Sequence, residues 1–214
     1  MVGFLSDELE NYITEHSEKT GSVEQSLRKE TLSLGPPSGM MSGDSVGNFL
    51  KFLVQINHCK RILEIGTFTG YSALMMASAL PESGELITCD VNSKTSKIAQ
   101  NHWNKSPHGG KIKLILGEAL NTLGGIGDSF DLIFIDADKN NYYNYFEICK
   151  KKLSNNGIMV VDNVLWSGRV LNPEDDQTES IDTFNKKITA DKAFWNTIIP
   201  IRDGLMIIKR KNNI

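Results

Sequence analysis

Short apolar runs alternate with longer amphipathic stretches along the chain from residue 60 onward. The apolar runs predict strands, and in chain order they read RILEI, LITCD, KIKLIL, DLIFID and GIMVVD. Between them, apolar positions recur at helical spacing, which predicts helices at about 71–80, 93–105, near Ala119 and at 140–153. Short, almost wholly apolar strands separated by helices are typical of a parallel sheet that helices cover on both faces.

The N-terminal part of the chain follows another pattern. Amphipathic stretches predict helices at 7–16, 22–32 and 46–56, which would form an N-terminal helical layer over residues 1–56. The stretch LGPPSGMMSGDS, which precedes the last of these helices, is too rich in Gly, Pro and Ser for regular structure.

The C-terminal part predicts a hairpin. After a helix at 181–192, the runs NTIIPI and GLMIIKR are close enough to pair about a turn at 202–203. We therefore expect an α/β fold with a mostly parallel, seven-stranded sheet, helices on both faces and a C-terminal antiparallel hairpin. No internal repeat or low-complexity linker divides the chain, so we expect one domain over 1–214, with the α/β core at 60–214.

Composition and charge narrow the classes of protein. The chain is 40% hydrophobic and 23% charged, which is ordinary for a soluble protein, and its net charge of −3 gives no reason to expect nucleic-acid or membrane binding. The N-terminal stretch carries acids where a signal peptide needs basic and then apolar residues, and no apolar run approaches the ~20 residues of a membrane span. We expect a cytoplasmic protein.

The cysteines and histidines give no metal or disulfide pattern. Widely spaced and odd in number, the cysteines are expected to be reduced, structural thiols: Cys59, Cys89 and Cys149. The histidines lack ligand spacing and are expected to be solvated: His16, His58, His102 and His108.

A glycine turn and an acid follow the first two predicted strands of the core. In parallel sheets, ligands bind outside the carboxyl ends of the strands, and the first strand ends in EIGTFTGYS, where Gly66 and Gly70 permit a sharp turn beside a ligand. A purely structural turn fits these glycines equally well. The second strand ends at Asp90, which can accept hydrogen bonds from the two hydroxyls of a ribose or can cap the helix from Ser93. Turn and acid together favour a nucleoside-containing cofactor.

Oxygen-bearing side chains follow the fourth and fifth strands. Asp136 ends the fourth strand, and Asp162 and Asn163 end the fifth, so the three side chains meet if the strands are adjacent. Two clustered carboxylates repel each other unless a cation lies between them, and an all-oxygen ligand set suits Mg²⁺, Ca²⁺ or Mn²⁺ better than zinc or copper. The alternative is that the two acids are unrelated strand-end caps.

Several segments together resemble one enzyme family. EIGTFTGYSALMMASALP, CDVN, FDLIFIDADKNNYYNYFE, GIMVVDNVLWSGRV and PIRDGL are similar to segments of the cation-dependent class I O-methyltransferases, the group of the catechol and caffeoyl-coenzyme A O-methyltransferases. The resemblance covers nearly the whole chain, is closest to the caffeoyl-coenzyme A branch and its bacterial members, and is most specific in DADK and DNVLW. It implies a Rossmann-like fold, S-adenosylmethionine as cofactor and a divalent cation, with Mg²⁺ expected before Mn²⁺ or Ca²⁺.

The resemblance also assigns residues. It implies that the methionine part of the cofactor lies along Glu64, Gly66, Thr67 and Ser72. It implies that Asp90 binds the ribose of the cofactor, that Ala119 contacts the adenine and that Asp138 faces the amino group. It also implies that Met40 and Ser42, in the loop SGMMSGD, cover the cofactor. It assigns the metal to Asp136, Asp162 and Asn163. In that loop the relatives usually carry an acidic residue where this chain has Val46.

Lys139 is the candidate catalytic residue. It lies three residues after Asp136, where it would accept the proton of an acceptor hydroxyl activated by the cation, or stabilise the oxyanion. A lysine acts as a base only if its pKa is lowered, which nearby cations favour. The alternative is a lysine at a helix start that pairs with Asp138.

The expected activity is methylation of a hydroxyl on a small catechol-like or caffeoyl-type aromatic acceptor. One alternative is a tRNA hydroxyuridine O-methyltransferase, against which the acidic charge balance counts. The other is a cofactor-binding protein without catalysis, against which the intact Asp136, Lys139, Asp162 and Asn163 count. We also expect a homodimer without membrane contact.

Overall fold

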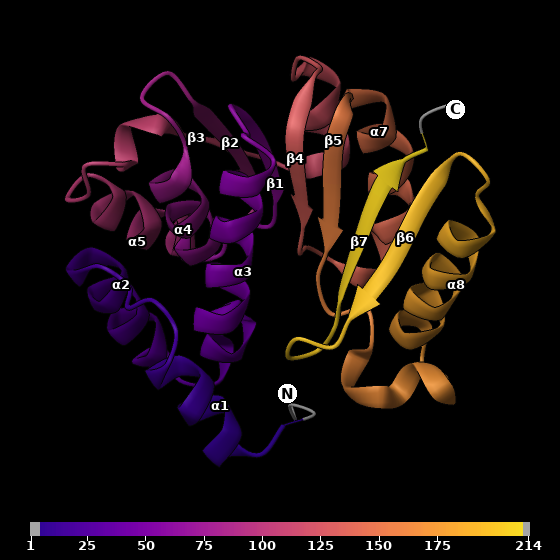
Figure 1. Cartoon of the computed structure of the whole chain (residues 1–214), viewed down its shortest axis with the longest axis horizontal. Helices are drawn as coiled ribbons and strands as arrows, with labels where there is room; N and C mark the ends of the chain where they lie inside the picture. The colour runs from indigo at the N-terminus through magenta and orange to yellow at the C-terminus, as the bar shows by residue number, and fades with distance from the viewer. Residues whose placement is uncertain (1–4, 212–214) are drawn as a thin grey trace.

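Seven strands form the centre of the molecule, which we describe from a computed structural model over residues 5–211. The strands are β1 (Arg61–Ile65), β2 (Glu85–Asp90), β3 (Ile112–Leu116), β4 (Phe130–Ile135), β5 (Leu153–Val161), β6 (Phe194–Ile199) and β7 (Leu205–Arg210). They make one sheet in the order β3-β2-β1-β4-β5-β7-β6 (Figure 1). Neighbours among β1 to β5 pair in parallel, and β7 is antiparallel to both β5 and β6. The predicted mostly parallel sheet with a C-terminal hairpin is confirmed.

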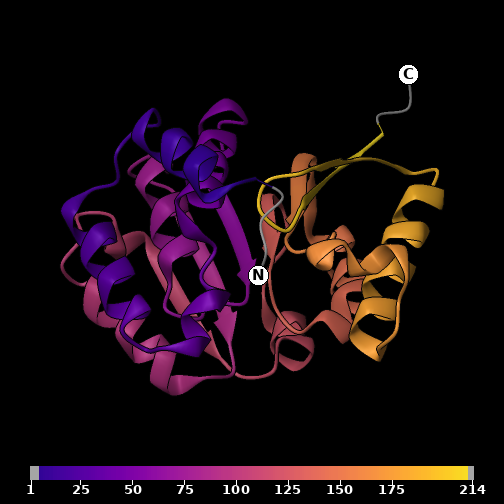
Figure 2. The same cartoon turned by 90° about the horizontal axis from the view of Figure 1, so that it is seen from below.

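Helices cover both faces of this sheet (Figures 1 and 2). They are α1 (Asp7–Glu15), α2 (Ser22–Leu32), α3 (Gly43–Ile56), α4 (Tyr71–Ala79), α5 (Ser93–Trp103), α6 (Ala119–Thr122), α7 (Tyr142–Lys152) and α8 (Asp176–Ala190). Successive strand residues point to opposite faces, so Ile62 of β1 joins the core under α2 to α5, while Leu63 joins the core under α6 to α8. Burial on both faces explains why these strands are almost wholly apolar.

Two helical segments begin earlier than the apolar pattern predicts. The stretch expected to be irregular contains a 3₁₀ helix over Pro36–Met40, and α3 begins at Gly43 instead of near Val46. Proline at the start of the 3₁₀ helix needs no backbone donor there and already has a helical φ. Similarly, α8 begins at Asp176, because the Asp175 side chain accepts a hydrogen bond from the Thr178 N–H at 2.9 Å and caps the helix.

The side chains expected to be structural thiols or solvated rings can now be placed. The three cysteines are buried and free, as predicted. The prediction for the histidines is wrong for His102, which is 1% exposed because α5 packs against α2. Its Nε2 lies 2.8 Å from the Glu30 carboxylate of α2. Within residues 5–211, none of the helices has the length and apolar character needed to cross a membrane.

Candidate active site

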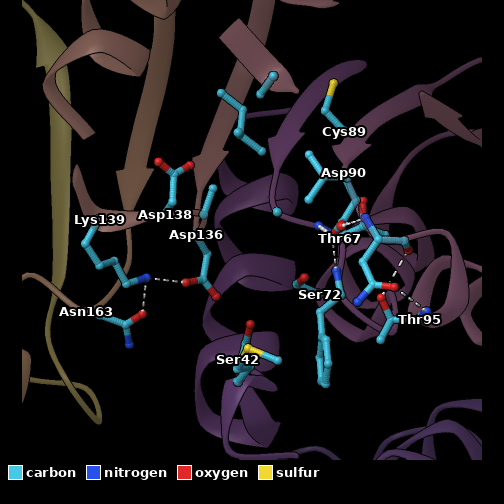
Figure 3. A pocket seen from close by; sticks show the side chains of 18 of the residues that line it. Ser42, Thr67, Ser72, Cys89, Asp90, Thr95, Asp136, Asp138, Lys139 and Asn163 are labelled. Atoms are coloured by element: carbon cyan, nitrogen blue, oxygen red, sulfur yellow. Dashed lines mark hydrogen bonds and ion pairs between the residues drawn. The ribbon is translucent and has the colours of Figure 1, made fainter. Parts of the chain in front are cut away.

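The strand order reverses between β1 and β4, and a cavity of about 570 Å³ lies at the carboxyl ends of these strands (Figure 3). This is the position at which parallel α/β sheets bind their ligands. Most residues assigned from the sequence line this cavity: Met40, Ser42, Gly66, Thr67, Ser72, Asp90, Ala119, Asp136, Asp138, Lys139 and Asn163. Glu64 and Asp162 do not line it; both are buried, and they contact the lining residues Ser72 and Asn163.

The glycine turn after β1 packs directly on the end of β4. Gly66 has φ +101°, and a Cβ atom there would lie 2.0 Å from the carbonyl oxygen of Asp136. Gly70, with φ +79°, precedes α4, and a Cβ there would meet the Trp103 ring at 2.5 Å. Both positions therefore require glycine, and the turn brings the N-terminus of α4 to the cavity.

Asp90 holds this turn in place. Its Oδ2 accepts hydrogen bonds from the backbone N–H groups of Thr67 at 2.9 Å and Phe68 at 2.7 Å. The alternative that Asp90 caps the next helix is wrong, because Asn92 caps α5 by accepting from the Lys94 N–H at 3.0 Å. Asp90 therefore links the ends of β1 and β2 and lines the cavity between them.

Glu64 is a fully buried carboxyl group behind the turn. Its two oxygens accept hydrogen bonds from the Ser72 hydroxyl and the Thr88 hydroxyl, each at 2.6 Å. Burial raises the pKa of Glu64 to about 8, against the effect of these two hydrogen bonds, and the charges of Asp136 and Asp90 add to the rise. A cation that enters the cavity would therefore favour the ionised form.

Asp138 is held by two side chains of the following segment. Its Oδ1 accepts a hydrogen bond from the Tyr145 hydroxyl, and its Oδ2 accepts one from the Asn141 amide at 2.5 Å. The aspartate itself is exposed and lines the cavity. It does not pair with Lys139, so the alternative of an Asp138–Lys139 pair is wrong.

The Lys139 ammonium group lies among the proposed metal ligands. It donates to Asp136 Oδ1 at 3.0 Å and to Asn163 Oδ1 at 2.8 Å, and both contacts are visible in Figure 3. It also donates to the Tyr142 hydroxyl at 2.6 Å. Burial lowers the pKa of Lys139, but Tyr142 and Asp136 raise it by more, so the net direction is upward. This is opposite to the expected lowering, and it makes Lys139 a donor in this arrangement.

Asp162 lies beside Asp136 because β4 and β5 are neighbours, with Ile135 paired to Val161 one residue earlier. Asp162 is 3% exposed, and its Oδ1 accepts from the Asn163 N–H at 2.7 Å. Burial raises the pKa of Asp162 to about 8, and the charge of Asp136 adds to the rise. The adjacency on which the metal hypothesis depends is therefore present in the sheet.

The donor set fits a hard divalent cation. Two carboxylates and one amide offer oxygen atoms alone, the ligand type that Mg²⁺, Mn²⁺ and Ca²⁺ prefer. Oxygen atoms of Asp136 and Asn163 already converge on one positive charge, that of Lys139. Within the described part of the chain, no cluster of three or more His, Cys, Asp or Glu side chains is placed to hold a metal. An ion here would thus depend on the Asn163 amide as well as the two carboxylates.

Tyr142 is a site residue whose role the sequence did not indicate. The tyrosines of NNYYNYFE lie at near-helical spacing, a pattern that is typical of packing and surface residues. The Tyr142 ring is indeed buried, 5.7 Å from Phe184 of α8. Its hydroxyl, however, accepts from Lys139 and donates to the Asp162 carbonyl oxygen at 2.8 Å. The i, i+3 spacing from Lys139 was the available signal.

Trp166 and Gln177 also line the cavity. Trp166 follows β5, and Gln177 lies in the first turn of α8. The Lys139 ammonium lies 5.7 Å from the centre of the Trp166 ring. Gln177 belongs to the polar stretch NPEDDQTES, so this stretch contributes a side chain to the cavity.

Comparison with known proteins places these features in a family context. A family model described as O-methyltransferase matches residues 14–211. A probable caffeoyl-CoA O-methyltransferase of Dictyostelium discoideum is 33% identical over 94% of this chain and 91% of that protein. The catechol O-methyltransferase domain-containing protein 1 of Mus musculus is 34% identical over 92% of this chain and 77% of its own length.

Solved structures give the same picture. The SAH-bound methyltransferase PaMTH1 of Podospora anserina superposes with a TM-score of 0.89 at 28% identity, covering 96% of this chain and 95% of that chain. An O-methyltransferase from Bacillus cereus in complex with SAH has a TM-score of 0.88 at 27% identity, covering 95% and 97%. The likeness therefore extends over the whole sheet and its helices.

Proposed function

This chain belongs to the O-methyltransferase family and is an S-adenosylmethionine-dependent enzyme, and we propose that it methylates one hydroxyl of a catechol-like or caffeoyl-type aromatic acceptor with a divalent cation. The family predicted from the sequence motifs is confirmed, and with it the cofactor and the Rossmann-like fold. The proposal depends above all on one observation. The glycine turn after β1 and the oxygen-bearing side chains of Asp136 and Asn163, which follow β4 and β5, line the same cavity.

We propose that the cofactor lies along the β1 side of this cavity. Its ribose hydroxyls would donate to Asp90, the acid at the end of β2. The methionine part would lie along Gly66, Thr67 and Ser72, with the buried Glu64 behind them supplying negative charge. The remaining contacts proposed from the resemblance are Ala119 at the adenine, Asp138 at the amino group, and Met40 and Ser42 as the cover.

We propose that Asp136, Asp162 and Asn163 hold the divalent cation, with Mg²⁺ expected first. Such an ion, when bound to the acceptor, would lower the pKa of the hydroxyl that is methylated. Lys139 would then bind the same oxygen. The upward pKa of Lys139 supports the role of a cationic donor that stabilises an oxyanion. Lys139 could accept a proton only if the influence of Tyr142 and Asp136, which raise its pKa, were reduced.

The size of the cavity supports a small acceptor. A volume of about 570 Å³ lies within the ~300–1,000 Å³ typical of small-molecule sites. Trp166 would stack on an aromatic ring, and Gln177 would contact its substituents. The net charge of −3 gives no support to the tRNA alternative.

We also propose a homodimer in the cytoplasm. Phe52 and Ile56 lie one turn apart on α3, and each is 55% exposed, a surface that a second copy would bury. Free, buried cysteines are in keeping with a reducing compartment. Analytical ultracentrifugation of the wild type beside a Phe52→Ser variant tests the dimer, and a wild-type monomer at micromolar concentration contradicts it.

The central test is methyl transfer from labelled S-adenosylmethionine. The acceptor panel contains catechol, caffeoyl-coenzyme A, monohydroxylated analogues of both, and tRNA with unmodified wobble hydroxyuridine. We expect transfer to the vicinal diols alone. Transfer to tRNA with none to the diols would replace the proposed acceptor.

The same assay tests the cation. EDTA should abolish transfer and added Mg²⁺ or Mn²⁺ should restore it, whereas Asp136→Asn should weaken the restoration. Glu82→Gln, a variant at an exposed carboxylate between α4 and β2, is the control and should behave as the wild type. Full activity in EDTA, with metal absent by elemental analysis, overturns the metal assignment.

A further inference from the structure

The segment 36–42 covers one side of the cavity. Met40, Met41 and Ser42 at its end line the cavity. Met41 and Ser42 are each 7% exposed and pack against the protein, whereas Met40 is 56% exposed. Gly35 and Gly43 flank it, both with φ +76°. Such flanking glycines allow the backbone to enter and leave the segment at a sharp angle.

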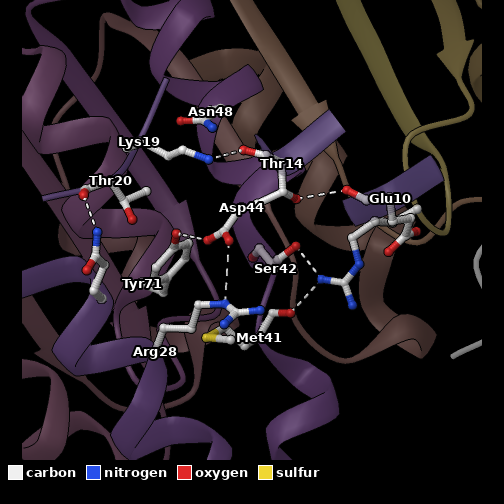
Figure 4. Close-up of polar contacts among 12 residues, drawn as sticks. Glu10, Thr14, Lys19, Thr20, Arg28, Met41, Ser42, Asp44, Asn48 and Tyr71 are labelled. Atoms are coloured by element: carbon white, nitrogen blue, oxygen red, sulfur yellow. Dashed lines mark hydrogen bonds and ion pairs between the residues drawn. The ribbon is translucent and has the colours of Figure 1, made fainter. Parts of the chain in front are cut away.

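One end of the segment is anchored to helices. Asp44, the residue after Gly43, accepts a hydrogen bond from the Tyr71 hydroxyl at 2.5 Å and lies 3.5 Å from Arg28 (Figure 4). This anchor fixes the start of α3. The carbonyl groups of Met41 and Ser42 are not part of this anchor, because they accept hydrogen bonds from the C-terminal hairpin.

Arg202, in the turn between β6 and β7, holds those carbonyl groups. Its Nη1 donates to the carbonyl oxygen of Met41 at 2.7 Å and to that of Ser42. The contacts join residues that are 161 and 160 positions apart in the sequence. Because the acceptors are backbone atoms, the contact fixes the path of the covering segment itself.

Two further features indicate that this contact is built into the fold. Arg202 has φ +49°, a left-handed conformation that disfavours any residue with a Cβ, and strained residues of this kind cluster at functional sites. A Cβ atom at Gly43 would lie 2.8 Å from Nη1 of Arg202, so the missing side chain leaves room for the guanidinium. A glycine at 202 would relax the turn, yet the chain has an arginine there.

We propose that Arg202 is a positioning residue that latches the segment 36–42 over bound S-adenosylmethionine. The latch slows the dissociation of the cofactor and of its product S-adenosylhomocysteine without contacting the reacting atoms. The inference rests on the proposed function in one respect, namely that the cofactor occupies this cavity. An arginine suits the task because its guanidinium is always charged and the two hydrogens on Nη1 can be donated to two adjacent carbonyl oxygens.

The hairpin that carries Arg202 also holds the chain around Trp166, another lining residue of the cavity. Oδ1 of Asp203 accepts from the Ser167 N–H, and the Asp203 carbonyl accepts from the Leu165 N–H at 2.9 Å. These contacts fix the chain on both sides of Trp166. The turn between β6 and β7 thus holds both the covering segment, through Arg202, and the chain around Trp166, through Asp203. Loss of the Arg202 contact should therefore affect cofactor binding and leave the contacts around Trp166 in place.

The test compares Arg202→Gly and Arg202→Lys with the wild type. Calorimetry and stopped-flow measurements give the affinity and dissociation rate of S-adenosylhomocysteine, and initial rates give kcat and the KM for S-adenosylmethionine. For Arg202→Gly we expect the dissociation constant, the dissociation rate and the KM to rise about tenfold, with kcat within twofold. Arg202→Lys should recover part of the difference. Hydrogen exchange of 36–42, slowed by the ligand in the wild type, should stay fast in Arg202→Gly.

Two controls separate the latch from general stability. Arg202→Gly removes backbone strain, so its melting temperature should not fall. Ser129→Gly relieves a similar left-handed residue, φ +69°, in the exposed loop before β4, and should leave the ligand constants unchanged. Wild-type ligand affinity and dissociation rate in Arg202→Gly, or a loss confined to kcat, overturns the latch but not the proposed function. A wild-type protein that binds neither cofactor nor product overturns both.

Discussion

Replacing Glu64 by Gln should change how the stability of this enzyme depends on pH. Glu64 is 0% exposed, and its oxygens accept from the hydroxyls of Ser72 and Thr88. Gln keeps the size and one carbonyl acceptor, and a hydroxyl can rotate to accept from the new amide. The substitution therefore removes the charge with little change in packing, and it imitates the protonated acid.

The magnitude follows from the pKa. Burial raises the pKa of Glu64 from 4.5 to about 8. At ~1.4 kcal/mol for each tenfold change in proton affinity, ionising Glu64 costs about 5 kcal/mol more in the folded than in the unfolded protein. Between pH 4.5 and about 8, Glu64 is protonated in the folded protein and ionised in the unfolded chain. Stability from protonated Glu64 is therefore complete below pH 4.5 and is lost progressively as the pH rises to about 8.

Urea unfolding of both proteins at pH 5, 6, 7 and 8, without cofactor, measures the effect. The difference in unfolding free energy should shift in favour of Glu64→Gln by up to ~1.4 kcal/mol for each pH unit. Asp162, whose pKa is also raised to about 8, titrates in both proteins and cancels in the difference. Parallel curves for the two proteins would refute the reasoning, because they would show Glu64 ionised in the fold at ordinary pH.

The cofactor adds a second measurement on the same pair of proteins. S-adenosylmethionine carries a positive sulfonium and a positive amino group, which would favour ionised Glu64 if the methionine part lies in front of it. Binding should then release more protons from the wild type at pH 7 than from Glu64→Gln, since Asp162 titrates in both proteins. Calorimetry in buffers of different ionisation enthalpy counts that proton. Equal proton release from both proteins would place the cofactor's charges away from Glu64.

Three other variants test the neighbouring contacts. Asp90→Ala removes the acceptor of the Thr67 and Phe68 N–H groups, so calorimetry should show cofactor affinity lower by ~2–3 kcal/mol; unchanged affinity would remove Asp90 from the ribose site. Tyr142→Phe takes a partner from Lys139, so urea unfolding should show a loss of ~1–3 kcal/mol together with a lower kcat; equal stability and rate would make the hydroxyl dispensable. Lys139→Ala should slow the single-turnover rate by ~10²–10⁴ while cofactor affinity stays, and a wild-type rate would make this lysine structural.

The sheet was predictable because each strand is an apolar run bounded by local signals. The residues at which the helices begin were less predictable. The apolar periodicity of α8 begins at Ile181, yet the helix begins at Asp176, because the polar first turn is stabilised by the Asp175 cap rather than by burial. Likewise the 3₁₀ helix at Pro36–Met40 is set by proline geometry within a stretch whose composition indicates a loop.

The meeting of the strand-end acids was predictable, because parallel neighbours bring Asp90, Asp136 and Asp162 to the same edge of the sheet. Pairings over long sequence separations were not. Lys139 binds Asn163, 24 residues away, and His102 pairs with Glu30, 72 residues away. Neither spacing carries a signal in the sequence. The upward pKa of Lys139 has a local cause, because Tyr142 and Asp136, which raise it, each lie three residues away; the opposite direction was expected because a cation was placed beside this lysine.

The close approach of Gly66 to the carbonyl oxygen of Asp136 limits which residues of this site can be substituted. No side chain, not even a methyl group, fits between the turn of β1 and the end of β4. In the proposed arrangement the cofactor lies at the end of β1 and the cation at the ends of β4 and β5, and neighbouring strands of a sheet are ~4.8 Å apart. The pairing of these strands would then set the distance over which the methyl group is transferred. Trp166 and Gln177 lie outside the sheet, so we expect substitutions at these two residues to change the choice of acceptor without changing that distance.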